Sequence, residues 1–438
     1  MAFSPLATAL QPDACYVLAF SGGLDSTVLL HQLVCWRQQQ PQLRLRALHV
    51  HHGLSPNADR WAQHCRHLCQ QWQVPCEILH VQVDGRDSGI EAAARAARYQ
   101  ALFAALQPDE QLLTAQHQDD QCETLLLALK RGSGPAGLAA MPARRQVGAH
   151  PHLRPLLAIN RLQLEQYAAE HQLDWIEDES NADSRYDRNF LRQQVLPLLR
   201  ARWPHFSAAT ARSAALCGEQ EQLLNELLAE QLAQLTDAQG ALHFPPLLAM
   251  SEIRRHALLR RWIASRGGAM PSRDALQRIT DEVMCSREDA QPCLHFGSAV
   301  LRRYRQHLFW LPALPSLRQV TLAWPQLSQP LPLPSGLGEL RAHPATSALR
   351  LPAADEQVTV RFHAHGYYHL VGRNGGRELK KVWQALGVPP WQRERIPLIF
   401  FNQTLIAAPG YFITREGAAS DDAGWQAIWS LHSQDNSR

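Results

Sequence analysis

The sequence contains no run that approaches the roughly 18 consecutive apolar residues of a membrane-spanning helix. Its N-terminal stretch, MAFSPLATALQPDA, carries no basic cluster, and prolines interrupt its apolar residues, so we do not expect a secretory signal. Neither sign of charge dominates, because 43 Lys and Arg residues face 40 Asp and Glu residues. A nucleic-acid partner would therefore have to be met by local basic patches. Together these features predict a cytoplasmic protein with no membrane contact.

The sequence also lacks a C-x-x-C motif. The chain has 9 cysteines, an odd number scattered over 438 residues, which suits reduced thiols better than a disulfide framework. One cluster of metal-ligand types, His64, Cys65, His67 and Cys69, falls in a stretch with helical character and has no second pair at zinc spacing. We therefore do not expect a structural zinc site.

What the sequence does have is length and an ordinary globular composition. A chain of 438 residues can form two or three domains, each with a core of its own. Hydrophobic residues make up 45% and charged residues 19%, as in typical globular proteins.

Residues 21–26, SGGLDS, are the feature around which the rest of the sequence is interpreted. They lie between the apolar run 15–20, which predicts a buried strand, and residues 27–33, which predict the first turns of a helix. Two glycines let the backbone approach an anion, and the first N–H groups of a helix lack partners, so this turn suits phosphate. A glycine turn with a Ser or Asp N-cap is the alternative that needs no ligand. The predicted ATP-binding residues are Ser21, Gly22, Gly23, Leu24, Asp25 and Ser26.

The acid in this turn indicates a cation, because a carboxylate among phosphates needs its charge balanced. Mg²⁺ bridging Asp25 to a polyphosphate would supply that balance. No Lys follows the glycines, so the motif is not the Walker sequence. SGGLDS instead resembles the pyrophosphatase loop, or PP-loop, of ATP enzymes that cleave between the α- and β-phosphates.

The N-terminal part of the chain alternates predicted strands with predicted helices, which indicates βαβ units and a doubly wound, Rossmann-like parallel sheet. In such sheets, ligands gather beyond the carboxyl ends of the strands. The clusters SGGLDS, HVHHGL and QHQDD all follow predicted strands, so we expect them to face one crevice. The predicted strands cover residues 15–20, 45–51, 76–83, 111–116 and 173–179, and helices are predicted at 58–73 and 90–106.

The segment HQDDQCET begins another predicted helix. An Asp N-cap followed by Glu three residues later is a capping-box pattern, which would explain Asp120 and Glu123 without any catalytic role. Two aspartates together with Glu123 exceed what capping needs, however, and both aspartates follow a strand on the phosphate side of the sheet. The excess favours either further Mg²⁺ ligands, with Asp25 and Asp120 as the metal ligands, or recognition of a substrate ammonium.

Basic residues gather at two further places. The segment RGSGPAG contains a literal G-x-G-x-x-G, but it follows a helix and includes Pro135, so we do not expect a dinucleotide site. With Lys130 and Arg131 beside it, this segment is better suited to following a nucleic-acid backbone. Arg188 and Arg192 lie four residues apart at a predicted helix start, where basic side chains are unfavourable unless an anion is near. A solvated basic helix start is the alternative.

These motifs converge on one family. In their order along the chain, SGGLDS, HVHHGL, EAAARAARY, HQDDQCET, RGSGPAGLAAM and SNADSRYDRNFLR together resemble the tRNA(Ile)-lysidine synthetase family. Residues 375–400 resemble the terminal tRNA-binding domain of that family, whereas the middle third of the chain shows little likeness.

The resemblance implies a two-step reaction on the wobble cytidine of tRNA(Ile) with anticodon CAU. The carbonyl oxygen at position 2 of the base first attacks the α-phosphate of ATP, which releases pyrophosphate and leaves an adenylated cytidine. The ε-amine of free L-lysine then displaces AMP and forms lysidine. ATP, Mg²⁺, lysine and the tRNA are therefore the expected substrates and partners.

By motif match, the resemblance implies catalytic roles for Asp25, Asp120, Glu123 and Arg192. Asp120 and Glu123 would either hold the lysine ammonium or take its proton, because an amine with a pKa of about 10.4 is mostly protonated at neutral pH. Arg192, or alternatively Arg188, would stabilise phosphoryl or adenylate oxygens. The expected tRNA contacts are Arg95, Arg98, Lys130, Arg131, Arg377, Lys380 and Lys381.

The remainder of the chain predicts a mainly helical middle domain and a small α+β C-terminal domain. Residues 219–235 carry apolar residues at helical spacing, and strands are expected within residues 294–311. The Pro-rich stretch 312–352 predicts either a linker or short edge strands. Between residues 358 and 401, seven basic residues face two acidic ones, an imbalance that suits phosphate contacts. We expect domains at residues 1–212, 213–312 and 313–438.

Two other functions share part of this pattern. A tRNA thiolase would use the same loop, but sulfur transfer needs a reactive cysteine or a cluster site, and the sequence has no C-x-x-C motif. A catalytically inactive tRNA-binding relative would not need Asp25, Asp120, Glu123 and Arg192 together. ATP-dependent release of pyrophosphate would distinguish an enzyme from such a binding protein. The sequence leaves the oligomeric state open, with a homodimer as one option.

Overall fold

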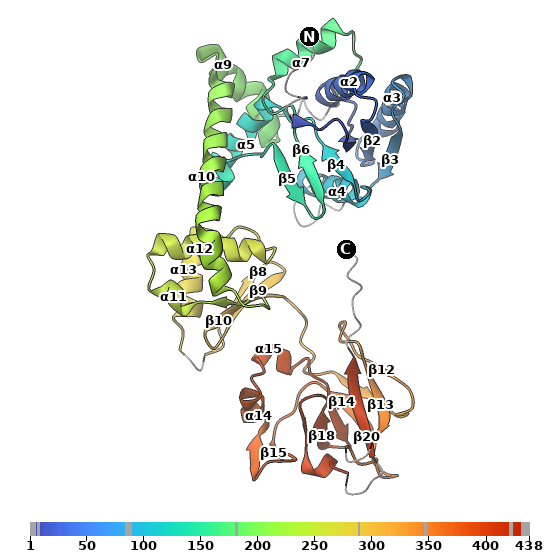
Figure 1. The fold of residues 1–438 in the computed structure, drawn as a ribbon, viewed down its shortest axis with the longest axis vertical. Helices are drawn as coiled ribbons and strands as arrows, with labels where there is room; N and C mark the ends of the chain where they lie inside the picture. Colours follow the sequence, from blue (N-terminus) through green and yellow to red (C-terminus); the bar gives the residue numbers. More distant parts are fainter. Residues whose placement is uncertain are drawn as a thin grey trace. The chain divides into compact units, whose positions relative to one another are not determined.

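A computed structural model with side chains describes residues 6, 9–83, 90–179, 183–287, 290–345, 348–419 and 424–430. The chain forms two compact units, Met1–Leu227 and Leu228–Arg438 (Figure 1). Within the described ranges, no helix is long and apolar enough to cross a membrane. Residues 180–182, which open the motif SNADSRYDRNFLR, lie outside the described residues.

A six-stranded sheet organises the first unit, with strand order β3-β2-β1-β4-β6-β5. Neighbouring strands are parallel except for β5 and β6, which are antiparallel. The strand order reverses between β1 and β4, so the carboxyl ends of these two strands mark the expected ligand crevice. The predicted doubly wound parallel sheet is confirmed. Its strands are β1 (Cys15–Ala19), β2 (Arg44–His51), β3 (Cys76–His80), β4 (Glu110–Leu113), β5 (Arg144–Val147) and β6 (His150–Leu153).

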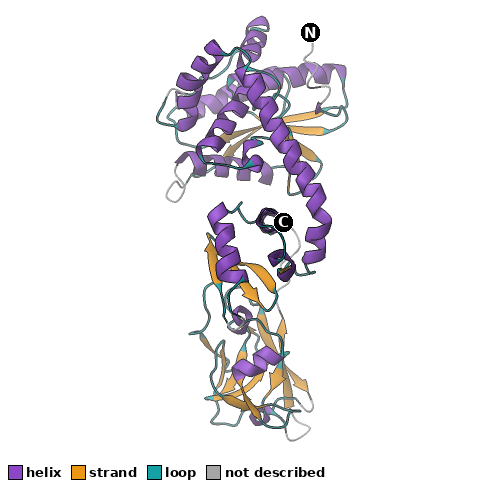
Figure 2. Ribbon diagram, turned by 90° about the vertical axis from the view of Figure 1, so that its left-hand side faces the viewer, coloured by secondary structure: helices purple, strands orange, loops and turns teal. Residues whose placement is uncertain are grey.

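Helices cover both faces of this sheet (Figure 2). Tyr16 and Leu18 of β1 belong to a large apolar cluster with residues of α2, α3 and α7, whereas Val17 packs with Leu48 and with Leu102 of α4. Successive side chains of a strand point to opposite faces, so burial on both faces explains the continuous apolar run of β1. The helices are α2 (Leu24–Gln39), α3 (Ala58–Gln71), α4 (Ile90–Ala104), α5 (Gln118–Lys130), α6 (Pro135–Leu138) and α7 (Arg161–Glu170).

The strand predicted at residues 173–179 is wrong, because these residues pair with no strand. Leu173 and Trp175 pack against the large apolar cluster, while the N–H of Ile176 donates to the carbonyl of Gly22 at 2.8 Å. The apolar residues of this segment are therefore buried by the helices and the glycine turn instead of by a neighbouring strand. The segment lies along the SGGLDS loop.

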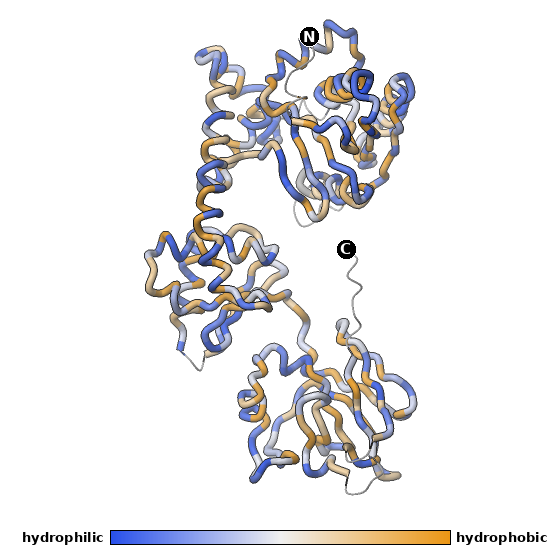
Figure 3. Tube along the Cα trace, in the orientation of Figure 1, coloured by the Kyte–Doolittle hydropathy of each residue, from blue (hydrophilic) through white to orange (hydrophobic). Residues whose placement is uncertain are grey.

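The first unit ends in helices that carry the predicted arginines. A short α8 (Asp187–Phe190), a π-helical turn (Leu191–Val195) and α9 (Leu196–Arg202) follow one another. The long helix α10 (Phe206–Leu235) comes next, and polar and apolar stretches alternate along it (Figure 3). Leu228 and Leu235, near its C-terminal end, join the core of the second unit.

The second unit opens with helices packed on a four-stranded antiparallel sheet of order β7-β10-β9-β8. Trp262, Leu301 and Leu308 are fully buried at the centre of its core. The strands β8, β9 and β10 lie at the predicted residues 294–311, to within one residue at each end, whereas β7 was not predicted. The elements are β7 (Leu242–His243), α11 (Pro245–Leu248), α12 (Glu252–Ser265), α13 (Arg273–Arg278), β8 (Cys293–Phe296), β9 (Ala299–Tyr304) and β10 (His307–Pro312).

The C-terminal part contains three small antiparallel sheets, of order β11-β14-β17-β18-β19, β12-β13-β20 and β15-β16. The Pro-rich stretch supplies strands of this domain and is not a linker. Within it, β11 and β12 are short edge strands, as one alternative predicted, whereas β13 is the central strand of its sheet and pairs with both β12 and β20. The elements are β11 (Thr321–Ala323), β12 (Leu331–Pro332), β13 (Glu339–Ala345), β14 (Val358–Arg361), β15 (Tyr367–His369), β16 (Gly376–Glu378), α14 (Leu379–Ala385), α15 (Pro390–Arg393), β17 (Leu398–Phe401), β18 (Thr404–Ala408), β19 (Phe412–Ile413) and β20 (Gly424–Ser430).

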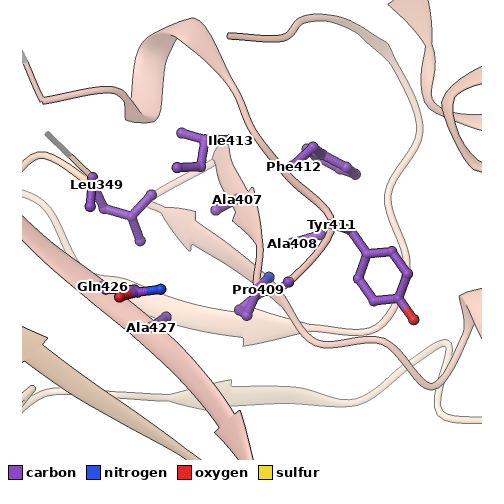
Figure 4. Close-up of a pocket in the computed structure, with 11 residues that line it drawn as sticks. Leu349, Ala407, Ala408, Pro409, Tyr411, Phe412, Ile413, Gln426 and Ala427 are labelled. Atoms are coloured by element: carbon purple, nitrogen blue, oxygen red, sulfur yellow. The ribbon is translucent and has the colours of Figure 1, made fainter. Parts of the chain in front are cut away.

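A small cavity of about 300 Å³ lies beside β18 in this C-terminal part (Figure 4). Leu349, Ala407 and Ile413 line it together with Gln426. Because its described lining includes no charged side chain, the cavity offers no group suited to phosphate or to acid–base chemistry. The candidate active site lies in the first unit instead.

Candidate active site

The SGGLDS turn connects β1 to α2 at the carboxyl edge of the sheet. Gly22 has a φ of +81°, and a Cβ there would lie 2.8 Å from Ile176 Cδ1, so the position requires glycine. Gly23 is the N-cap of α2, and no side chain caps the first N–H groups of this helix. The Ser26 hydroxyl donates to the Gly23 carbonyl at 3.0 Å and contacts the Ser21 hydroxyl at 3.0 Å. The turn therefore presents main-chain amides and hydroxyls, the groups that bind phosphate.

His117 caps the N-terminus of α5, which corrects the predicted Asp N-cap with Glu123 as its partner. His117 Nδ1 accepts the N–H of Asp119 at 3.2 Å, and the Asp120 carboxylate accepts the N–H of His117 at 3.0 Å. The imidazole replaces an aspartate as the cap, so the helix begins three residues earlier than expected. Glu123 is left out of the cap, and its side chain points into the protein, where it is fully buried.

Asp120 and Glu123 share one arginine, Arg192. Its Nε donates to Glu123 Oε1 at 2.7 Å, and its Nη2 donates to Glu123 Oε2 at 3.1 Å and to Asp120 Oδ1 at 2.9 Å. Arg188 is farther away, with its Nε 3.7 Å from Glu123 Oε2 and its Nη2 donating to the hydroxyl of Thr124. The geometry therefore favours Arg192 over Arg188 as the partner of the two acids.

Burial controls the electrostatics of this group. Burial raises the pKa of Glu123 above its ordinary value, although the hydrogen bond and charge of Arg192 oppose that change. Burial alone would lower the pKa of Arg192, but the hydrogen bond and charge of Glu123 raise it overall. Arg192 therefore stays positively charged, while Glu123 takes up a proton more readily than a surface glutamate.

Asp25 is connected to Asp120, and through it to Arg192, by the side chain of His117. The Nε2 of His117 lies 3.6 Å from Asp25 Oδ2 and 3.5 Å from Asp120 Oδ2, and Arg161 Nη1 donates to Asp25 Oδ1 at 3.1 Å. Burial raises the pKa of Asp25, but His117 and Arg161 lower it overall. Burial lowers the pKa of His117, whereas the charges of Asp120 and Asp25 raise it overall. We call this continuous set of contacts the acid–arginine network, which consists of Arg161, Asp25, His117, Asp120, Arg192 and Glu123.

Asp119 holds the surrounding helices together. Its carboxylate accepts the main-chain N–H of Arg161 at 2.9 Å and the hydroxyl of Ser207 at 3.0 Å, and it forms an ion pair with Arg200 Nη2 at 2.6 Å. The surplus aspartate beside Asp120 was the only signal of this junction in the sequence. Arg161, Arg200 and Ser207 lie outside every motif, so sequence analysis did not find them.

Asp25 is the more exposed of the two predicted metal ligands, Asp25 and Asp120. Both oxygens of Asp120 accept hydrogen bonds, from Arg192 and from the main chain of His117. The Asp25 side chain is 28% exposed and belongs to the glycine turn, where its oxygens and phosphate oxygens would hold Mg²⁺ together. Among the described residues, no group of three or more His, Cys, Asp or Glu side chains is arranged to hold a metal ion. Phosphate and water would therefore have to provide the other ligands of Mg²⁺.

Two of the predicted tRNA-binding residues lie on α4. The Nε of Arg98 donates to His52 Nε2 at 3.2 Å, which connects α4 to the HVHHGL turn. The guanidinium of Arg95 lies 5.3 Å from the centroid of the Tyr99 ring. Both side chains are exposed, so both can reach a phosphate backbone.

The other predicted tRNA-binding residues are also at the surface. Lys130 pairs at 2.6 Å with Asp187, the first residue of the helix α8 that carries Arg188, and Arg131 is the exposed C-cap of α5. The remaining residues lie in the second unit, where Arg377 is exposed in β16 and Lys380 and Lys381 are exposed in α14.

A glycine turn after the first strand of a parallel sheet, with an acid inside the turn, defines an α/β protein with an ATP-binding PP-loop. A family model described as a PP-loop domain matches residues 3–199. Two further models, described as the TilS substrate binding domain and the TilS substrate C-terminal domain, match residues 242–309 and 358–429. Proteins with a PP-loop domain catalyse several different reactions. Relatives with high sequence identity along the whole chain distinguish among these reactions.

The chain belongs to the tRNA(Ile)-lysidine synthase family. It is 55% identical over 424 residues to the tRNA(Ile)-lysidine synthase of Salmonella newport (strain SL254), with 97% of this chain and 98% of the relative covered. The synthase of Salmonella typhi gives the same identity and coverage. A thiolase is therefore not favoured.

Solved structures also resemble parts of the chain. The U34-tRNA thiolase NcsA from Methanococcus maripaludis has a TM-score of 0.42 at 16% identity, covering 47% of this chain and 72% of that chain. A crystal structure of a TilS C-terminal domain has a TM-score of 0.20 at 18% identity, covering 25% of this chain and 100% of that chain.

Proposed function

We propose that this chain joins free L-lysine to position 2 of the wobble cytidine of tRNA(Ile) with anticodon CAU, forming lysidine, AMP and pyrophosphate from ATP. The observation that carries the proposal is the acid–arginine network, which runs from Asp25 of the phosphate loop to the buried Glu123. It joins groups suited to a polyphosphate and groups suited to an ammonium in one set of contacts. A protein that only bound tRNA would have no use for that combination.

In the first step, the glycine turn and the N-terminal amides of α2 hold the β- and γ-phosphates. The carbonyl oxygen at position 2 of the cytidine attacks the α-phosphorus, and the bond to the β-phosphate oxygen breaks. Mg²⁺ held by Asp25 would neutralise part of the charge on the phosphates. Arg192, fixed by three hydrogen bonds, stabilises the phosphoryl oxygens during the attack.

In the second step, the ε-amine of lysine attacks C2 of the adenylated cytidine, and AMP leaves with the former carbonyl oxygen. The amine must first lose a proton, because it is mostly protonated at neutral pH. Glu123 is the better base of the two acids, since burial raises its pKa toward the working range. Asp120, which is less deeply buried, holds the ammonium before the proton is removed.

The tRNA is held by basic residues of both units, including Arg95, Arg98, Lys130 and Arg131 in the first unit. In the second unit, a cavity of about 920 Å³ is lined by Lys380 and further basic side chains, which suits phosphate. Two tryptophans in the same lining can stack on bases. The remaining proposed tRNA contacts are Arg377 and Lys381, and the basic and aromatic lining includes Arg318, Arg393, Arg395, Trp383 and Trp391.

We assign these roles to three domains, at residues 1–212, 213–312 and 313–438. The three family-model matches, residues 3–199, 242–309 and 358–429, each fall within one of these ranges, which supports the division. We also propose that the reaction takes place in the cytoplasm, where both tRNA and ATP are available.

The test is incorporation of labelled lysine into a CAU-anticodon tRNA(Ile) transcript by the purified full-length chain. We expect incorporation only with ATP present, and one pyrophosphate released for each lysine attached. The matched control is the same transcript with the wobble cytidine replaced by uridine, which should remain unlabelled. Pyrophosphate release without lysine attachment would contradict the proposal.

A further inference from the structure

Arg161 belongs to the acid–arginine network, but the reaction described above gives it no task. It is the first residue of α7, where Asn160 caps the helix in a capping box with Gln163. Its main-chain N–H donates to the buried carboxylate of Asp119 at 2.9 Å. None of these contacts uses the Arg161 side chain, so the position of its main chain does not depend on that side chain.

The side chain of Arg161 is held more loosely than that of Arg192. Its Nη1 donates to Asp25 Oδ1 at 3.1 Å, and its Nε donates to Glu165 Oε1 at 2.9 Å. Glu165 is 49% exposed, so water competes with that ion pair. Arg192, in contrast, is fixed by both Asp120 and the fully buried Glu123. A guanidinium carries five N–H donors, so Arg161 keeps donors for a further ligand.

The negative charge of Asp25 explains why the Arg161 side chain would move when a polyphosphate binds. Asp25 places a negative charge in a turn built for phosphate, and Arg161 balances that charge at a distance of 3.1 Å. A polyphosphate arrives with counter-ions of its own, which then balance Asp25 instead. The guanidinium is thereby released within reach of the phosphates, to which arginine binds in bidentate fashion.

We propose that Arg161 is a phosphate-binding residue that pairs with Asp25 in the nucleotide-free protein and turns to the β- and γ-phosphate oxygens when ATP binds. It stabilises the charge that develops on pyrophosphate as the bond to the α-phosphorus breaks. The inference rests on the proposed function only for the identity of this leaving group. Binding of ATP and of inorganic pyrophosphate tests it without tRNA or lysine.

Calorimetric titration of the full-length chain with ATP, inorganic pyrophosphate and AMP is the experiment. Arg161→Ala should weaken binding of ATP and pyrophosphate by about tenfold or more, as expected for one lost charge-assisted contact. AMP lacks the two phosphates that Arg161 contacts, so its affinity should stay within about twofold. Arg161→Lys, which keeps the charge but not the fork, should fall between the wild type and Arg161→Ala. Glu165→Gln is the matched control and should bind pyrophosphate as the wild type does.

Unchanged pyrophosphate affinity in Arg161→Ala, with a lower melting temperature, would show a purely structural ion pair and overturn the inference. A higher KM for lysine with unchanged pyrophosphate binding would overturn it as well, because Arg161 would then contact the carboxylate of lysine. If Arg161→Ala does not fold, Arg161→Lys decides between the same outcomes. A wild-type chain that binds ATP but attaches no lysine would contradict the proposed function alone.

Discussion

Replacing Arg192 by alanine removes the central cation of the acid–arginine network. Three hydrogen bonds to Asp120 and Glu123 disappear, and Glu123 keeps only Arg188, whose Nε lies 3.7 Å away. We expect Arg192→Ala to lose nearly all lysine incorporation while the protein remains folded. Both parts of this expectation follow from the burial and contacts of the two acids.

The loss of stability is limited by solvent. Removing one partner of a buried ion pair costs about 3–5 kcal/mol. The Arg192 side chain is 36% exposed, however, and Glu123 has a raised pKa, so water and a proton replace part of what is lost. We therefore expect a stability loss of about 2 kcal/mol, against a total of about 5–15 kcal/mol for a typical domain. The catalytic loss should be about 100- to 1,000-fold, the usual effect of removing one electrostatic donor.

The assay is single-turnover incorporation of labelled lysine, with thermal melting of the same samples. Arg188→Ala is the matched control, because it removes a neighbouring arginine that makes only the 3.7 Å contact and one hydrogen bond to Thr124. We expect less than about a tenfold loss in that control. An Arg192→Ala rate within threefold of the wild type, or a larger loss in Arg188→Ala, would refute the assignment of Arg192.

Three further predictions address the loop, the acids and the C-terminal domain. Gly22→Ala should melt at a lower temperature and bind ATP more weakly, because the φ of Gly22 is +81° and a Cβ there would lie 2.8 Å from Ile176. Gly23→Ala is the control, because a Cβ at Gly23 meets nothing closer than 3.5 Å. Equal losses in both variants would contradict the requirement for glycine at position 22. The pKa of Asp25 is lowered in the folded state, so the Asp25 carboxylate stabilises the fold fully above its ordinary pKa of about 3.9, and this stabilisation is lost as pH falls through the lowered value. Asp25→Asn should therefore make the melting temperature depend less on pH in the acidic range. An unchanged dependence would exclude this contribution of Asp25. Truncation after residue 312, which removes both β13 and its partner β20, should raise the KM for tRNA more than that for ATP, and equal changes would argue against a tRNA-binding role.

The parallel sheet and its ligand-binding edge could be predicted because their signals are local. The apolar run of β1, the two glycines and the helical stretch of α2 follow one another within a short segment, and each favours the same structure. The right-handed connection of βαβ units also accounts for helices on the faces of the sheet, but it does not fix the strand order β3-β2-β1-β4-β6-β5, which was not predicted. Burial of β1 on both faces, with Val17 facing one cluster and Leu18 the other, is the packing that its sequence predicts.

Features that depend on distant residues could not be predicted. Residues 173–179 have the composition of a strand, but Trp175 packs on the apolar cluster and Ile176 contacts Gly22, far away in the sequence. Arg161 reaches the active site only because Asp119 anchors its main chain. In the same way, the Pro-rich stretch forms a regular strand because β20, at the end of the chain, pairs with it.

The identity of the helix cap was ambiguous for a different reason. Aspartate and histidine can both accept an N–H at a helix start, and HQDDQCET offers them within four residues. The choice of His117 leaves Asp120 and Glu123 available for Arg192, which no local pattern reveals.

We propose that one continuous network, the acid–arginine network, serves both the adenylation step and the lysine-transfer step. A pulse–chase experiment tests it most directly: enzyme, ATP and CAU-anticodon tRNA(Ile) are mixed without lysine, and lysine is added later. We predict one pyrophosphate per bound tRNA before the chase, and release of AMP together with lysine attachment after it. Arg192→Ala should lose both phases, whereas Glu123→Gln should keep the first and lose the second. Pyrophosphate release that does not depend on tRNA, or AMP release before lysine is added, would contradict the claim.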